Sequence, residues 1–214
     1  MEISDRLVEL ARKRAAGFAL EGFVKGKGPE DAKVMLVGEA PGETEVGSLI
    51  PFSGRAGKEL MKFMAMAGLT REDVFITSAV RSRPYRYGEK TDRKTGETIK
   101  RRYNRPPTQK EILAHAPVLD AEIQMIHPEI ILAMGNVGLK RLLGKSYQVS
   151  EQHGKIYQGP VQYLARLDDQ TYSWTEKEYT VLATFHPASI FYNRQLLPLI
   201  EADWQLLRQQ LEEK

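Results

Sequence analysis

Four short apolar runs, spread along the chain with helical patterns between them, constrain the fold more than any other feature of the sequence. They are Lys33–Val37, Val74–Thr77, Glu129–Met134 and Tyr179–Thr184. None shows the polar alternation of a strand with one wet face, so each predicts a strand buried on both faces. Strands that alternate with helices predict an α/β, three-layer sandwich with a central, mainly parallel four-stranded sheet flanked by helices.

Apolar residues at helical spacing predict the helices that cover this sheet. Thr108 begins one of them, with Glu111 three residues later completing a capping box. Residues 148–167 are interrupted by glycine and proline and predict a hairpin. A chain of 214 residues predicts a single domain, 1–214. The expected helices span residues 3–16, 58–67, 108–126, 137–143 and 196–211.

Three unusual segments follow strand ends. The first strand runs into the glycine-rich stretch 38–57, the second into Ser78, and the fourth into Phe185-His186-Pro187. Ligands of parallel sheets bind beyond the carboxyl ends of the strands. We therefore expect these three segments to converge on one crevice.

The charge of the chain is unevenly placed. The net charge is only +3, yet residues 81–105 contain ten Lys or Arg against three acids, so the rest of the chain is mildly acidic. A basic insertion at about 82–106, too polar to pack in a core, indicates a polyanionic partner met on one face. A solvated loop is the alternative that a charge run alone leaves open.

The amino-acid composition excludes several kinds of chemical site. The chain contains no cysteine, which excludes disulfides and cysteine-held metal or iron–sulfur centres. Its four histidines show no ligand spacing, so we expect no metal. No apolar window has the length of a membrane span, and residues 1–5 lack a secretion-signal pattern. We expect a cytoplasmic monomer without a cofactor.

Several motifs, in this order, resemble the uracil-DNA glycosylase superfamily, with its family-four branch nearest. They are Gly38-Glu39-Ala40-Pro41-Gly42 after the first strand, Pro51-Phe52-Ser53-Gly54-Arg55-Ala56-Gly57, and Phe185-His186-Pro187-Ala188-Ser189 after the last strand. The likeness extends over nearly the whole chain. It implies the fold of that superfamily and a DNA-repair enzyme that removes uracil by hydrolysis.

The chain departs from the family in its cysteines and at single positions. Family-four enzymes usually hold an iron–sulfur cluster with four cysteines, and two of those positions correspond here to Ser82 and His115. The asparagine that reads uracil in the family corresponds to Ser78. A serine hydroxyl has one donor and rotates, so we expect looser base selection or a lower rate. Asn104 stands where a covalently trapped subclass has histidine, so trapping is not expected.

The resemblance implies three catalytic side chains. His186 would donate a hydrogen bond to the departing base, on which negative charge collects as the bond breaks. Glu39 would position water or stabilise a sugar that becomes cation-like in the transition state. Glu45 would share that role or line the pocket near C5 of the base. For each residue a structural role, or an exposed glutamate, remains the alternative.

Other residues would hold the base and the strand. Phe52 would stack on an everted base, unless it is a core residue. Ile190 or Phe191 would wedge into the vacated stack, unless they pack in the core. The expected substrate-binding residues are Gly38, Ala40, Pro41, Gly42, Phe52 and Ser78. The expected DNA-binding residues are Ser53, Gly54, Arg55, Lys100, Arg101, Arg102, Ala188, Ser189, Ile190 and Arg194.

The resulting hypothesis is a DNA glycosylase that everts and hydrolyses uracil or a related deaminated base. Three alternatives stay open at this point. One is a lesion-binding protein of the same fold without catalysis, suggested by Ser78 and Val46. The others are an enzyme that uses the glycine-rich segment for a nucleotide phosphate, and an RNA-binding module.

Overall fold

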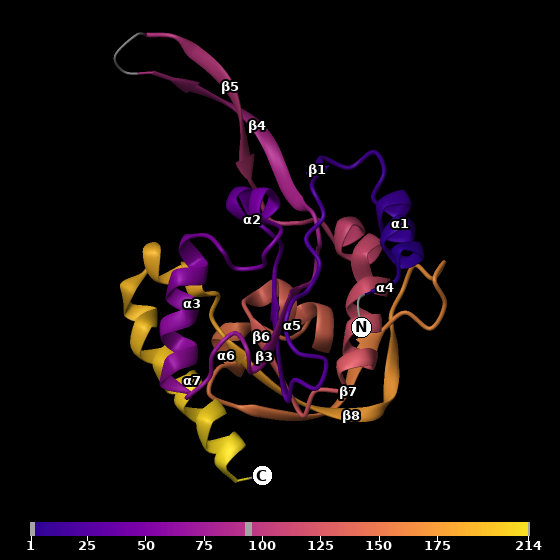
Figure 1. Ribbon diagram of the computed structural model, residues 1–214, viewed down its shortest axis with the longest axis vertical. Helices are drawn as coiled ribbons and strands as arrows, with labels where there is room; N and C mark the ends of the chain where they lie inside the picture. The colour runs from indigo at the N-terminus through magenta and orange to yellow at the C-terminus, as the bar shows by residue number, and fades with distance from the viewer. Residues whose placement is uncertain (1–2, 93–95, 214) are drawn as a thin grey trace.

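A five-stranded sheet forms the centre of the computed structural model, which describes residues 3–92 and 96–213 (Figure 1). The strand order is β3-β2-β6-β8-β7, and β7 alone runs antiparallel to its neighbour. The predicted α/β class with a mainly parallel sheet is confirmed. The sheet has five strands rather than four, because the segment expected as a hairpin pairs with β8 and adds an edge. These strands are β2 (Val34–Gly38), β3 (Val74–Ser78), β6 (Ile130–Met134), β7 (Ile156–Tyr163) and β8 (Ser173–Thr184).

Helices cover both faces of the sheet, as the period-two pattern of its strands requires. Along β2, Met35 and Val37 pack with the helices α4 and α5, whereas Val34 and Leu36 pack with α3 and α7. Both faces are buried because successive side chains along a strand point alternately into two apolar layers. The helices α1 to α7 are Asp5–Arg14, Glu43–Ser48, Arg55–Met66, Gln109–Ile126, Asn136–Leu143, Val149–Gln152 and Leu197–Glu212. Two 3-10 turns, η1 (Pro187–Phe191) and η2 (Arg194–Leu196), lie between β8 and α7.

The basic insertion forms a hairpin of β4 (Arg83–Thr91) and β5 (Thr98–Asn104) that projects from the body (Figure 1). At its root it pairs with the two-residue strand β1 (Leu20–Glu21). The sequence pattern predicted no strands here. Tyrosine and threonine nevertheless occur in both segments, β5 adds Ile99, and these residues favour strands. Beyond its buried start at residues 82–84, the insertion stays out of the core, as its polarity predicted.

The carboxyl ends of the parallel strands meet at one edge of the sheet. Gly38 at the end of β2 lies opposite Ser78 at the end of β3, and Met134 lies opposite Thr184. The chain leaves β2 toward β3 on one side and later returns to β6 on the other. This reversal of strand order is where α/β sheets bind ligands.

A buried charge pair supports the end of β3. The Arg81 guanidinium forms an ion pair with Glu122 of α4, and Thr77 donates a hydrogen bond to the same carboxylate. Both charged side chains are fully buried, so each depends on the other to offset the cost of its desolvation. Arg81 also donates to the backbone oxygen of Ser78, which fixes the strand end beside the pocket.

Among the described residues, no helix has the length and apolar character that crossing a bilayer requires.

Candidate active site

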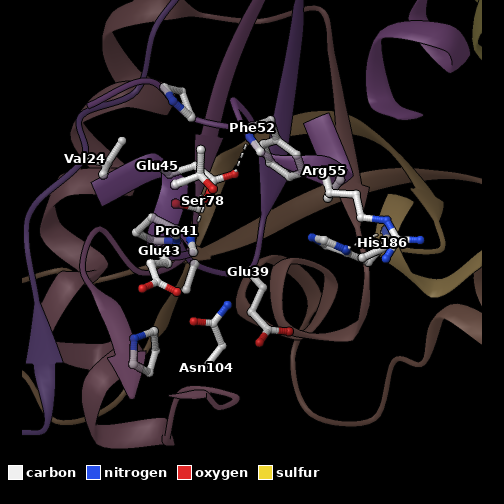
Figure 2. Close-up of a pocket in the computed structure, with 18 of the residues that line it drawn as sticks. Val24, Glu39, Pro41, Glu43, Glu45, Phe52, Arg55, Ser78, Asn104 and His186 are labelled. Carbon is white, nitrogen blue, oxygen red and sulfur yellow. Dashed lines mark hydrogen bonds between the residues drawn. The ribbon is translucent and has the colours of Figure 1, made fainter. Parts of the chain in front are cut away.

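A cavity of about 630 Å³ lies over the carboxyl ends of the sheet (Figure 2). The glycine-rich segment, the end of β3 and the segment after β8 all line it, so the structure brings together the three stretches expected to converge. The root of the β4–β5 hairpin forms a further wall. The cavity is lined by Val24, Glu39–Glu45, Pro51, Phe52, Gly54–Ala56, Ser78, Pro84, Asn104–Pro106, His186, Ala188, Phe191 and Tyr192.

His186 presents a defined nitrogen to this cavity. Its Nδ1 accepts a hydrogen bond of 3.1 Å from the Ala188 backbone N–H, so in the neutral ring the proton is on Nε2. Burial lowers the pKa of His186 to about 4. The imidazole is therefore neutral near pH 7, and its Nε2–H is a donor available to a ligand.

Glu39 supplies the carboxylate of the cavity. Its backbone oxygen accepts from Val80 N–H at 3.0 Å, which anchors the residue directly after β2. Burial raises the pKa of its carboxyl group above the ordinary value of 4.5. In Figure 2 the carboxylate and the Asn104 amide extend into the same part of the cavity. A carboxylate of raised pKa is a better proton acceptor than an exposed one.

Glu45 lines the cavity, as one of its two expected roles required, and it also organises the segment. One carboxylate oxygen accepts from Gly42 N–H and the other from Gly54 N–H, each at 3.1 Å. Gly42 and Gly54 are the N-cap residues of α2 and α3, so one carboxylate lies at the positive ends of two helices. Both oxygens are engaged, which indicates that Glu45 shapes the cavity.

Phe52 belongs to the core and to the cavity at once. It has a left-handed backbone (φ 52°), and Arg71 donates to the carbonyl oxygens of both Pro51 and Phe52. Its ring centroid lies 5.6 Å from that of His186. A Cβ at position 38 would lie 2.8 Å from the ring, so Gly38 is the residue that lets Phe52 close over the sheet. The two expected roles of Phe52 are thus compatible.

The Ser78 hydroxyl is fixed rather than free to rotate, contrary to the sequence-based expectation. It donates to the Val80 backbone oxygen at 2.8 Å and accepts from Arg81 at 3.3 Å. Its hydrogen is used within the protein, so it offers only an acceptor to the cavity. This contact could not be read from sequence, because it depends on the buried Arg81–Glu122 pair.

Asn104 is a cavity residue whose orientation the sequence did not reveal. Its Oδ1 accepts from Arg83 Nε at 2.5 Å, so its amide NH₂ is the group turned to the cavity. In Figure 2 this NH₂ points toward Glu39. From the sequence, Asn104 was identified only as the counterpart of a histidine. No local sequence pattern predicts that an arginine on the other strand of the hairpin fixes the orientation of its amide.

The segment after β8 is placed as expected, but its side chains are used differently. Ala188 and Phe191 line the cavity, and the Arg55 guanidinium lies 3.8 Å from the Phe191 ring centroid. Ile190 packs against the core, whereas Tyr192 is 91% exposed. Tyr192 is therefore more available for insertion into DNA than Ile190 or Phe191.

The remaining expected DNA-binding residues lie around the cavity or away from it. Ser53 forms a 2.6 Å hydrogen bond with Ser48 beside the cavity. The Ser189 hydroxyl is buried and has no partner among the described residues. Arg194 is exposed at the start of η2. Lys100, Arg101 and Arg102 lie on the hairpin, outside the cavity lining.

The two residues that stand in place of cluster cysteines do not fit an iron–sulfur cluster. Ser82 and His115 are buried and in contact, with 3.3 Å between the hydroxyl oxygen and Nε2. Nδ1 of His115 lies 2.9 Å from the Glu111 backbone oxygen, to which it donates, and burial lowers the His115 pKa to about 4. These side chains satisfy one another. The described residues contain no group of three or more His, Asp or Glu arranged to hold a metal.

Comparisons with known proteins agree with the geometry. Residues 25–208 match the family model described as the uracil DNA glycosylase superfamily. A type-4 uracil-DNA glycosylase of Sulfurisphaera tokodaii is 34% identical over 87% of this chain and 73% of its own length. The type-4 enzyme of Saccharolobus solfataricus is also 34% identical, over 89% of this chain and 77% of its own. That of Archaeoglobus fulgidus is 30% identical over 85% of this chain and 78% of its own.

Proposed function

Because this chain belongs to the uracil-DNA glycosylase superfamily, we propose that it removes uracil from DNA by hydrolysis, with Glu39 and His186 at the reacting atoms. It is a hydrolase of N-glycosyl bonds that acts in DNA repair. The target base must leave the helix, since the bond is inaccessible within a stack. The cavity over the sheet is large enough for a nucleotide and carries a carboxylate and an imidazole on its walls.

One observation carries this proposal: the Ala188 N–H donates to His186 Nδ1, which leaves the Nε2–H of the neutral ring for a ligand. As the bond from C1′ to the base nitrogen breaks, the bonding electron pair leaves with the base and charge collects on its oxygen. The Nε2–H donates to that oxygen and lowers the barrier. Removing a donor of this kind costs roughly 10²–10³ in rate.

Glu39 activates the water. The water oxygen bonds to C1′ while the base departs, Glu39 accepts the proton, and solvent protonates the released base anion. The raised pKa of Glu39 supports its role as proton acceptor. The Asn104 amide, held by Arg83, has the position of a donor that orients the same water.

Base selection follows from the fixed hydroxyl of Ser78. Its one free capacity is to accept, which suits the imino N–H of uracil. Cytosine has an unprotonated nitrogen at that position and would face the serine oxygen with a second acceptor. Hypoxanthine also carries an imino N–H. We therefore expect deaminated bases as a class to be accepted, with uracil preferred, because the relatives are named uracil-DNA glycosylases.

Strand contacts surround the cavity. Arg55, which lines the cavity, and Ser53 beside it would contact the phosphates of the target strand, since the N–H groups of Gly42 and Gly54 already donate to Glu45. The segment from Ala188 to Tyr192 approaches the gap left by the everted base. The hairpin cations Lys100, Arg101 and Arg102 add salt-sensitive affinity. We further propose that the protein is a cytoplasmic monomer and binds DNA without a metal ion or an iron–sulfur cluster.

The test is release of free base from oligonucleotides that each contain one uracil, hypoxanthine, xanthine or cytosine. We expect uracil to be released fastest, hypoxanthine more slowly, and cytosine not at all. Alkali should then break the strand at the vacated site. Binding without release of any base would contradict the proposal and would favour a lesion-binding protein of the same fold.

A further inference from the structure

The β4–β5 hairpin extends far beyond what the cavity requires. The pairs Tyr85↔Asn104 through Thr91↔Thr98 join the two strands only to each other, whereas β1 reaches only the root. Figure 1 shows the ribbon projecting from the body. A two-stranded ribbon by itself is marginally stable in water. A ribbon exposed on both faces is therefore expected to act against a partner.

Both faces of the ribbon are basic. Directly opposed residues of an antiparallel pair share a face. The register thus places Lys100 and Arg102 on one face with Tyr87, and Arg86, Lys90 and Arg101 on the other. Glu89, the only acid within the two strands, lies opposite Lys100, and Arg102 is ion-paired with Glu21, so the face of Arg86 and Lys90 is the more basic of the two. A partner that meets both faces must be a polyanion with charge on two sides.

Tyrosine rings hold several of these cations in place. Lys100 Nζ lies 4.3 Å from the Tyr87 ring centroid, and the Arg86 guanidinium lies 5.8 Å from that of Tyr103. Contacts of this kind restrain long side chains before a ligand arrives. Tyr87 and Ile99 are 52% and 56% exposed, so each face also presents an apolar surface that base edges can contact.

The root of the ribbon is tied to the wall of the cavity. Glu43 of α2 forms ion pairs with Arg83 at 3.5 Å and with Arg101 at 3.3 Å. Pro84 and Asn104, at the root, line the cavity itself. The ribbon therefore has a fixed place beside the nucleotide in the cavity, and the DNA nearest to it is the duplex next to that nucleotide.

We propose that the β4–β5 ribbon enters the major groove of the duplex beside the everted nucleotide. This proposal rests on the proposed function and adds duplex DNA as its substrate class. A major groove about 12 Å wide admits a two-stranded ribbon, whereas a minor groove about 6 Å wide admits one only if the duplex is deformed. A ribbon within a groove has phosphates on both sides, which matches cations on both faces. A ribbon lying along one backbone would use the cations of one face only.

The test compares groove protection by two triple variants and the unmodified protein on a uracil-containing duplex. The first variant, Arg86→Ala/Lys90→Ala/Lys100→Ala, removes cations from both faces of the ribbon; none of these residues takes part in an ion pair of the hairpin root. The matched control, Lys33→Ala/Lys145→Ala/Lys177→Ala, removes the same charge from exposed positions outside the hairpin. Dimethyl sulfate reports guanine N7 in the major groove and adenine N3 in the minor groove.

The unmodified protein and the control are expected to protect guanine N7 next to the uracil. The ribbon variant should lose this protection, bind the duplex at least about tenfold more weakly, and lower the salt slope of binding by about 3. Its loss on single-stranded DNA should be smaller. Duplex binding without N7 protection by the unmodified protein would overturn the proposal, even if the ribbon variant bound weakly, because phosphate contacts alone would then explain the cations.

Release of free uracil separates the two proposals. Uracil release without N7 protection would contradict the groove placement and leave the proposed function intact. N7 protection without uracil release would do the reverse. Thermal melting of both variants checks that the sheet is unaffected, since the substituted side chains are exposed.

Discussion

The cavity and the β4–β5 hairpin meet at Asn104, yet they are built in opposite ways. The cavity stands on buried strand ends, and its Ser78, Glu45 and His186 side chains each accept hydrogen bonds from fixed groups of the protein. The hairpin is exposed, and exposed or partly exposed ion pairs hold its root. Bond breaking requires atoms held in place, whereas gripping a long polyanion requires charge spread along a surface. Substitutions in the cavity should therefore change the chemical step, and substitutions in the hairpin should change salt-sensitive binding.

Glu39→Gln should cause the largest loss. The amide cannot accept the proton of water, so single-turnover base release should fall by about 10²–10⁴, while binding of the duplex changes little. Quenched-flow or manual sampling at saturating protein measures this rate. Glu72→Gln, an exposed glutamate away from the cavity, serves as the matched control and should release uracil at the normal rate.

His186→Ala should lower the single-turnover rate by about 10²–10³, because the donor to the departing base is lost. His186→Gln places an amide N–H at a similar distance along the side chain and should recover part of the rate. A rate for the glutamine variant equal to that of the alanine variant would show that hydrogen-bond donation is not what His186 contributes.

Glu45 and Glu43 allow the two kinds of construction to be compared within one helix. Glu45→Ala leaves two backbone N–H groups without their acceptor and should cost about 2–3 kcal/mol in the free energy of unfolding. For a chain of this size the melting temperature should then fall by roughly 5–10 °C. Glu43→Ala removes an exposed ion pair with Arg101 and a second one with the buried Arg83, which keeps its ion pair with Glu21, and it should cost less than about 1 kcal/mol. Equal losses in calorimetry would contradict this distinction.

The pH dependence of the chemical step should follow Glu39. Its pKa is raised above 4.5, so the carboxylate takes up a proton as the pH falls, and the rate should decline about tenfold per pH unit below that pKa. His186 stays neutral down to a pH of about 4, so the upper part of this limb reports Glu39 alone. The acid limb should be absent in Glu39→Gln. Persistence of the limb in that variant would assign it to another group.

The sequence predicted the cavity better than its surroundings. Runs such as Val34–Gly38 reveal strands through their own side chains, and strand-end rules then bring Glu39, Ser78 and His186 together. The fifth strand was expected only as part of a hairpin over residues 148–167, because Ile156–Tyr163 has mixed polarity and its place in the sheet depends on pairing with β8. The β4–β5 hairpin was missed because its charges obscured a weak strand pattern.

The orientations of polar side chains could not be predicted from sequence. Ser78 and Asn104 are each turned by an arginine, Arg81 and Arg83, whose own position depends on a distant glutamate. Helix caps are easier to predict from sequence when the two capping residues are close together in the chain, as Thr108 and Glu111 are. Glu45 also lies close to Gly42, but its second contact with Gly54 spans the whole glycine-rich segment.

The division between chemistry and grip is tested most directly by measuring single-turnover uracil release and duplex affinity together, at two salt concentrations. The proteins are the unmodified chain, His186→Ala and the ribbon variant. We predict that His186→Ala loses about 10²–10³ in rate at saturation and keeps its affinity and salt slope, whereas the ribbon variant loses affinity and salt slope and keeps its rate at saturation. A loss of affinity in His186→Ala with an unchanged rate at saturation would contradict the account.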